Sequence, residues 1–211
     1  MSEINIVIPT YNRPQGLLGV RYFGQHAKWV LPESQQSSYW KVLNKEQMII
    51  IPDKCDGNIG RKRNWILDNI PRPLIMIDDD VRHISTMQGR VADEDFTPYI
   101  KVDIEVFIEF IQQGFEVCDQ FGAKMWGVAQ KPDEREYREF IPLNMTKPVL
   151  GPFTGHLDHP LRYDEEMGSK DDYDMALQQL REYKKVIRLN YMAYDCDHGN
   201  NAGGIVSMRT Q

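Results

Sequence analysis

The chain has 211 residues, of which 41% are hydrophobic and 27% charged, and its formal net charge is −6 at pH 7. This length suits one domain with a substantial core, and the composition excludes a disordered chain. The acidic charge argues against a general nucleic-acid binder, which needs a basic face, but leaves room for a local basic groove.

Short apolar runs alternate along the chain with stretches of helical spacing, a pattern typical of an α/β protein with a mainly parallel sheet. The predicted strands are residues 4–9, 28–32, 47–52, 73–78, 123–130, 148–157 and 186–194. The predicted helices are residues 14–27, 36–43, 58–70, 103–121 and 171–185. A charged loop is expected at 131–139 and a Gly/Asn-rich tail at 195–204.

Neither the apolar runs nor the cysteines indicate a membrane or secreted protein. No apolar run approaches the roughly 20 residues that a spanning helix needs, and the first residues resemble a strand rather than a signal segment. The three cysteines are odd in number and widely spaced, so we expect reduced, structural thiols. We therefore expect a cytoplasmic protein.

Three consecutive aspartates, Asp78, Asp79 and Asp80, follow the apolar strand predicted at 73–78. Ligands of α/β sheets bind beyond the carboxyl ends of the strands. Alternate side chains of an extended chain share a face, so Asp78 and Asp80 are predicted to point one way and Asp79 the other. Such a pair suits a hard divalent cation, which would offset the repulsion between the carboxylates. The alternative is an acidic turn that caps the next segment.

Two further polar segments precede the aspartates along the chain. Residues 8–14, IPTYNRP, follow the first strand, and residues 58–64, NIGRKRN, lead into a helix. Arg61, Lys62 and Arg63 cluster where a helix N-terminus already favours anions. The alternatives are ordinary loop chemistry for the first segment and a solvated basic helix start for the second.

In this order the segments resemble the nucleotide-binding half of a GT-A fold glycosyltransferase, which binds a nucleotide-sugar with Mn²⁺ or Mg²⁺ at an acidic DxD motif. The resemblance implies one GT-A-like (Rossmann-like) domain over residues 1–211, with a mixed, mainly parallel sheet flanked by helices. Its nucleotide-sugar-binding half would span about 1–85 and its acceptor-binding half about 86–211. It also implies that Asp80 coordinates the metal and that Asp78 lies near the ribose or uracil. The residues that it assigns to nucleotide-sugar binding are Pro9, Thr10, Tyr11, Arg13, Glu33, Arg61, Arg63, Asn64, Asp78 and Asp79.

A second acidic pair, Asp171 and Asp172, opens the helix predicted at 171–185. The helix dipole favours carboxylates in a first turn and alone explains the pair. The segment also resembles the family's ED motif, which implies that Asp172 is the general base of an inverting transferase and Asp171 its neighbour. An acceptor hydroxyl must lose its proton as it attacks the anomeric carbon, and a carboxylate can accept it. A retaining reaction stays open.

Histidines in two later segments are further candidates. By the same resemblance His198 would complete the metal's shell, with Asp197 as second choice; the alternative is a solvated loop histidine. His156 and His159 are spaced unlike the helical HExxH zinc pattern. Gly155 and His156 are instead predicted to lie in an acceptor-side loop near the sugar.

The segments VLPESQQ, DGNIGRKRNWIL, MIDDDV, KDDYDMALQ and NNAGG together resemble the TET-associated glycosyltransferases of bacteriophages. That resemblance implies a UDP-sugar donor and an acceptor such as a 5-hydroxymethylpyrimidine in phage DNA, reached as a flipped base in the host cytoplasm. Candidate phosphate contacts are scattered, at Lys41, Lys45, Lys131, Arg135, Arg138 and Lys147. The alternatives are a nucleotidyltransferase of similar architecture and an inactive nucleotide-sugar-binding module. The oligomeric state is left open.

Overall fold

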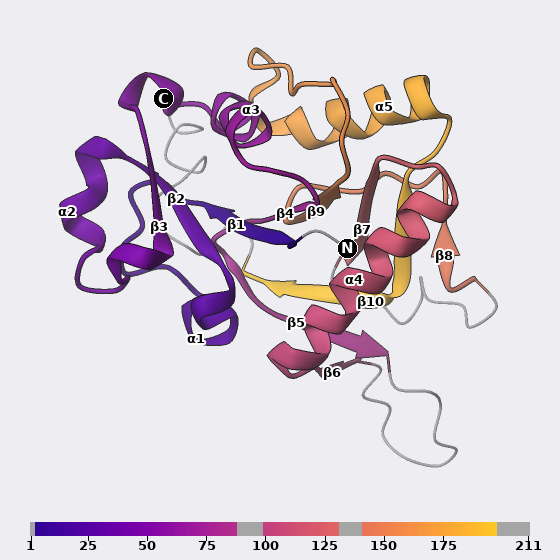
Figure 1. The fold of residues 1–211 in the computed structure, drawn as a ribbon, viewed down its shortest axis with the longest axis horizontal. Coiled ribbons are helices and arrows are strands. Elements are labelled where there is room, and N and C mark those ends of the chain that lie inside the picture. The colour runs from indigo at the N-terminus through magenta and orange to yellow at the C-terminus, as the bar shows by residue number, and fades with distance from the viewer. Residues whose placement is uncertain (1–2, 88–98, 131–140, 198–211) are drawn as a thin grey trace.

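The computed structural model describes residues 3–87, 99–130 and 141–197, and ten strands of these residues form one mixed sheet (Figure 1). The strands are β1 (Asn5–Pro9), β2 (Lys28–Pro32), β3 (Met48–Ile51), β4 (Leu74–Ile77), β5 (Val81–Met87), β6 (Tyr99–Lys101), β7 (Met125–Gln130), β8 (Leu143–Asn144), β9 (Phe153–His156) and β10 (Ile187–Cys196). Their order is β3-β2-β1-β4-β9-β7-β10-β5-β6, and β8 pairs with β10 off this path.

The strand directions bring the ends of several strands to one edge of the sheet. Strands β3, β2, β1 and β4 are parallel neighbours, and so are β7 and β10, while β9 runs antiparallel to both β4 and β7. The last residue of β4, Ile77, therefore pairs with the first residue of β9, Phe153. As a result the carboxyl ends of β1, β4 and β10 meet the starts of β5 and β9.

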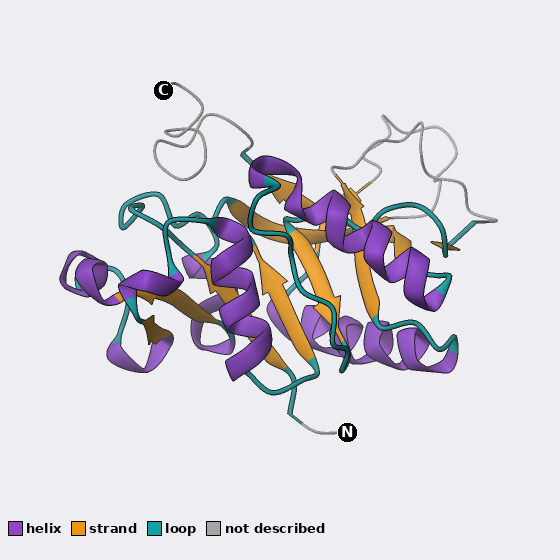
Figure 2. Ribbon diagram, turned by 90° about the horizontal axis from the view of Figure 1, so that it is seen from above, coloured by secondary structure: helices purple, strands orange, loops and turns teal. Residues whose placement is uncertain are grey.

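Helices cover both faces of the sheet (Figure 2). The helices are α1 (Val20–Phe23), α2 (Gln36–Tyr39), α3 (Ile59–Asn69), α4 (Ile104–Gln120) and α5 (Asp171–Tyr183). Helices α3 and α5 lie on one face and α1 and α4 on the other (Figure 1). Two hydrophobic clusters fill the layers, with Ile66 of α3 and Met175 of α5 in one and Phe23 of α1 and Phe107 of α4 in the other. The predicted single-domain α/β architecture is confirmed.

The helix predicted at 14–27 is the main local difference from the sequence analysis. Only Val20–Phe23 is α-helical, followed by a 3₁₀ turn at Gly24–His26. Pro14, Gly16 and Gly19 interrupt the predicted stretch, and a Cβ on Gly19 would lie 2.7 Å from the carbonyl oxygen of Val81. The chain here packs too closely against the start of β5 for a continuous helix.

The sequence pattern does not predict strand β5. Its burial pattern alternates only in part, and its antiparallel partner β10 lies about 100 residues further along the chain.

Among the helices of the described ranges, none combines the length and apolar character needed to cross a membrane.

Candidate active site

The three aspartates lie at the carboxyl end of β4, in the turn to β5. The backbone N–H of Asp78 donates to the carbonyl of Pro152, which precedes β9, at 3.1 Å, and Asp197 N–H donates to the carbonyl of Asp80 at 3.2 Å. The turn is therefore tied to the segments before β9 and after β10. This common edge is where α/β sheets bind ligands.

Asp79 points into the protein and holds the loop that follows β1. The residue is 8% exposed, and its carboxylate accepts a hydrogen bond from Thr10 Oγ1 and forms an ion pair with Arg13, both at 2.7 Å. The hydroxyl of Tyr39 contacts Thr10 Oγ1 at 3.0 Å and accepts from the backbone N–H of Arg13 at 2.9 Å. Thr10 and Arg13, predicted to bind the nucleotide, thus bond to Asp79 and fix the loop.

Tyr11 is presented by this fixed loop. Pro9, the last residue of β1, is buried and Tyr11 is half-buried, with Lys62 Nζ 5.6 Å from the centroid of its ring. Lys62 is itself buried, donates to the carbonyl of Thr10 and pairs with Asp56 at 2.9 Å. Burial lowers the pKa of Lys62 while Asp56 opposes this shift. The loop therefore has two buried cationic supports, Arg13 and Lys62.

Glu33 follows β2 and is exposed at the same edge of the sheet. The turn that contains Glu33 contacts the loop after β1, because Gln35 Oε1 accepts a hydrogen bond from the backbone N–H of Asn12 at 2.7 Å. Asn12 has a φ of 52°, a left-handed conformation that asparagine tolerates better than most residues. Glu33 thus lies near the predicted nucleotide loop, and its contact with a ligand stays a prediction.

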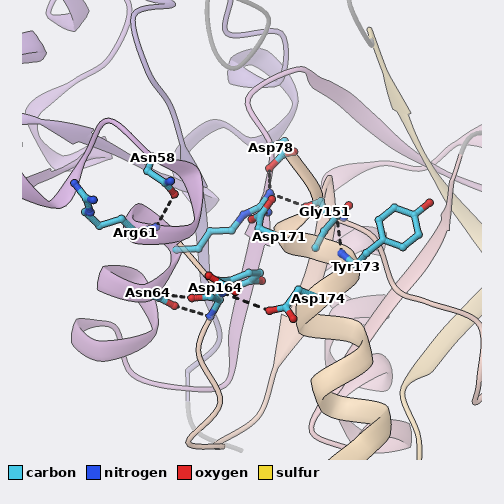
Figure 3. Close-up of polar contacts among 12 residues, drawn as sticks. Asn58, Arg61, Asn64, Asp78, Gly151, Asp164, Asp171, Tyr173 and Asp174 are labelled. Carbon is cyan, nitrogen blue, oxygen red and sulfur yellow. Dashed lines mark hydrogen bonds and ion pairs between the residues drawn. The ribbon is translucent and has the colours of Figure 1, made fainter. Parts of the chain in front are cut away.

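Arg63 joins the two acidic segments. Its guanidinium donates to Asp78 at 2.7 Å and to Asp171 at 2.6 Å, and the side chain is 4% exposed (Figure 3 shows Asp78 and Asp171 facing one another). The ring of Tyr163 lies 5.5 Å from the guanidinium carbon. Two carboxylates already occupy this guanidinium, so the predicted contact of Arg63 with the nucleotide-sugar would require it to give up one of them.

The remaining predicted residues of α3 are tied to the loop before α5. Arg61 is exposed and pairs with Glu165 at 2.9 Å, while Asn58 caps the helix by accepting from the N–H of Arg61 at 3.2 Å (Figure 3). Asn64 donates to the carbonyl of Tyr163 at 2.9 Å and accepts from its N–H at 2.8 Å. Asn64 therefore serves as a clamp between α3 and this loop, and Arg61 remains at the surface.

Asp172 is held by a backbone group next to Arg63. Asp172 Oδ2 accepts from the N–H of Gly151 at 3.0 Å, and the carbonyl of Gly151 accepts from Arg63 at 3.4 Å. Asp172 is half-buried, whereas Asp171 is 3% exposed and saturated by Arg63. Asp172 Oδ1 also accepts from the N–H of Tyr173 at 2.8 Å, so each oxygen has a backbone donor, and of the two predicted carboxylates Asp172 is the less buried.

The electrostatics of the aspartate turn disfavour three bare charges. Burial raises the pKa of Asp78 and of Asp79, and Arg63 and Arg13 respectively oppose the shift. Burial, together with the charges of Asp78 and Asp79, raises the pKa of Asp80 to about 7. A positive charge brought close to Asp80, such as that of a divalent cation, would oppose this shift.

The carboxylates fit a divalent cation in the chemistry of their donors, since Mg²⁺ and Mn²⁺ prefer oxygen ligands and keep positions for phosphate and water. Within the described ranges, no group of three or more His, Cys, Asp or Glu side chains is arranged to hold a metal ion. His198, predicted as a further ligand, lies outside the described residues. Asp197 lies at this edge but pairs with Arg82 at 2.6 Å.

The predicted sugar contacts of Gly155 and His156 require correction, because both residues belong to β9 in the middle of the sheet. His156 is fully buried, contacts His159 at 3.0 Å between ring nitrogens, and lies 3.4 Å from the hydroxyl of Tyr163. A Cβ on Gly155 would lie 2.2 Å from Trp126 Nε1. Close packing explains this glycine, and both residues lie inside the sheet rather than in a loop beside a sugar pocket.

Several residues of the site were missed by the sequence analysis. They are Tyr39, Asp56, Gly151, Tyr163 and Glu165. Asp56 had a usable signal, because it follows a predicted strand at the ligand-binding edge. The others act through contacts between distant segments that no local pattern reveals.

Comparison with known proteins identifies a family. The family model described as TET-Associated Glycosyltransferase matches residues 4–204. No curated protein sequence gives a significant match. Among solved structures, a CMP:2-keto-3-deoxy-manno-octonic acid synthetase complexed with CTP is similar with a TM-score of 0.48 and 10% identity, over 99% of this chain and 96% of that one. A mannose-1-phosphate geranyltransferase from Thermus thermophilus has a TM-score of 0.42 and 7% identity, over 92% and 75%.

Proposed function

Because the chain belongs to the TET-associated glycosyltransferase family, we propose that it transfers a sugar from a UDP-sugar to an acceptor hydroxyl with the aid of Mn²⁺ or Mg²⁺. The observation that carries this proposal is the pair of hydrogen bonds from Arg63 to Asp78 and Asp171, which joins the two acidic segments at one site. A transferase needs such a junction, since the donor diphosphate and the acceptor hydroxyl flank one anomeric carbon. The family match also favours this function over a nucleotidyltransferase.

The donor would bind against the loop after β1. Tyr11 offers a half-buried ring for the nucleotide base, and the Asp79–Arg13 pair keeps the loop in place before binding. Arg61, exposed at the start of α3, is available at the surface for the diphosphate, although it would exchange its contact with Glu165. A metal ion at Asp80, with Asp78 nearby, would when bound neutralise charge on the departing diphosphate.

Asp172 would act as the general base. Its carboxylate is half-buried, and the N–H groups of Gly151 and Tyr173 donate to its two oxygens at 3.0 and 2.8 Å, so the carboxylate that would accept the proton has a fixed orientation. Removing the proton from an acceptor hydroxyl as it attacks lets a single in-line displacement proceed, with inversion at the anomeric carbon. The exposed ring of Tyr173, beside the base, would face the acceptor.

The acceptor that we propose is a 5-hydroxymethylpyrimidine in phage DNA. The family description associates these transferases with TET, and the base would have to leave the helix to reach Asp172. With a net charge of −6, DNA contacts must be local, and exposed Lys41, Lys45 and Lys147 are the candidates within the described ranges. This acceptor implies action in the host cytoplasm if the protein is encoded by a phage.

Donor binding is tested with a panel of nucleotide-sugars in the presence and absence of Mn²⁺. Thermal unfolding should shift upward with UDP or a UDP-sugar plus Mn²⁺ and much less without the metal ion. ADP, GDP and CMP compounds serve as matched ligands. The absence of a shift with every uridine compound would refute the proposed donor.

The base is tested with Asp172→Asn, which keeps the size of the side chain and removes its ability to accept a proton. Transfer should fall by about 10²–10⁴-fold, the usual contribution of a general base, while the UDP-induced thermal shift is retained. Retained transfer would refute the role of Asp172.

A further inference from the structure

We propose that Arg63 and Gly151 are positioning residues that couple the donor-side carboxylate Asp78 to the base Asp172. This inference rests on the proposed function and deepens it. The two carboxylates lie on different elements, at the end of β4 and in the first turn of α5. Arg63, on α3, lies between them and contacts both segments.

The first step of the argument is that Arg63 is occupied inside the protein. One terminal nitrogen donates to Asp171 at 2.6 Å, and the other donates to Asp78 at 2.7 Å and to the carbonyl of Gly151 at 3.4 Å. The guanidinium is a planar fork, and its geometry matches two carboxylates better than a point charge would. A phosphate that binds Arg63 would have to displace one of these partners.

The second step is that Gly151 links the position of Arg63 to that of Asp172 through hydrogen bonds to both. Its carbonyl accepts from Arg63 and its N–H donates to Asp172 Oδ2, so one residue contacts both groups (Figure 3 shows Gly151 beside Asp171). A Cβ on Gly151 would lie 3.2 Å from the Arg63 nitrogen, 3.2 Å from Asp172 Oδ2 and 3.3 Å from Asp172 Cβ. A glycine at this position therefore lets both side chains approach the backbone closely.

The consequence is a continuous chain of hydrogen bonds from Asp78 through Arg63 and Gly151 to Asp172. A shift of the arginine would move the donor-side carboxylate and the base relative to each other. Reactions that depend on a near-attack geometry lose rate when reacting groups are misplaced by an ångström. Disturbing Arg63 or Gly151 should therefore lower kcat and leave donor affinity nearly unchanged.

The decisive variants are Arg63→Lys and Gly151→Ala, with Arg181→Gln on the exposed side of α5 as the control. Lysine keeps the charge but cannot bridge two carboxylates as a fork does, so kcat should fall at least about tenfold with donor KM changed less than about twofold. Gly151→Ala should lower kcat in the same way without removing a charge. A raised donor KM with unchanged kcat in Arg63→Lys would overturn the proposal, because it would indicate direct diphosphate binding.

Unfolding provides a second readout that needs no turnover. Arg63→Gln leaves the buried Asp171 and the half-buried Asp78 without their cation and should lower Tm, whereas Arg63→Gln/Asp171→Asn removes the buried charge and should recover part of the loss. Additive Tm losses would refute the coupling. If wild-type protein transferred no sugar, the proposed function would fail, and a Tm recovery in the double variant would still support the buried bridge.

Discussion

Replacing Asp79 by Asn tests the claim that the middle aspartate holds the nucleotide loop rather than a ligand. The substitution removes the charge that pairs with Arg13, while the side-chain oxygen can still accept from Thr10. The two ion-pair partners have side chains only 8% and 9% exposed and lie 2.7 Å apart. Truncating one partner of such a buried pair costs about 3–5 kcal/mol, because the other charge is left unpaired.

Since the hydrogen bond from Thr10 is retained, we expect the lower end of this range, about 3 kcal/mol. For a chain of this length each kcal/mol shifts Tm by about 2–4 °C, so Tm should fall by about 6–12 °C. Urea unfolding should give the same loss of free energy, and donor KM should rise because the loop that carries Tyr11 is loosened.

The matched control is Asp68→Asn. Asp68 pairs with Arg162 at 2.6 Å, but the side chains are 54% and 34% exposed, respectively. An exposed pair contributes about 1 kcal/mol or less. Equal destabilisation by Asp79→Asn and Asp68→Asn would refute the argument from burial.

Two further predictions concern β9 and the buried histidines. Gly155→Ala should lower the free energy of unfolding by about 1–3 kcal/mol, because its Cβ would meet the Trp126 ring nitrogen at 2.2 Å; an unchanged Tm with a raised donor KM would instead restore the residue to a sugar pocket. Burial, aided by the charges of nearby arginines, lowers the pKa of His159 to about 4. The native state therefore binds fewer protons than the unfolded one, whose histidine titrates near 6.5, and stability should fall by up to about 3 kcal/mol as pH drops from about 6.5 to about 4. His159→Gln should flatten this part of the pH profile of unfolding, and an unchanged slope would contradict the assignment.

The strands were the most predictable part of the fold. The apolar runs at 28–32 and 73–78 correspond to β2 (Lys28–Pro32) and β4 (Leu74–Ile77), because buried strands need continuous hydrophobic stretches. The stretch 14–27 was wrongly predicted as one helix, since periodicity does not register the close approach of Gly19 to Val81. Tertiary packing therefore decides the conformation of residues 14–27.

The sequence predicts the location of the site better than it predicts which of its charged side chains form ion pairs with one another. A strand followed by aspartates indicates a ligand-binding edge, and a helix that opens with Asp171 and Asp172 indicates a second acidic segment. The sequence does not show which charges meet. The sequence therefore predicts that Arg63 binds the nucleotide-sugar, whereas in the structure it bridges Asp78 and Asp171.

The most direct test of the account is the release of UDP from a UDP-sugar with Mn²⁺ and a DNA duplex containing 5-hydroxymethylcytosine, followed by the mass of the DNA. We predict that wild-type protein releases UDP and adds one sugar to each modified base, and that Asp172→Asn binds UDP but adds none. UDP-sugars that bind without any gain in the mass of the DNA would contradict the proposed acceptor. Equal sugar transfer by wild type and Asp172→Asn would contradict the proposed base.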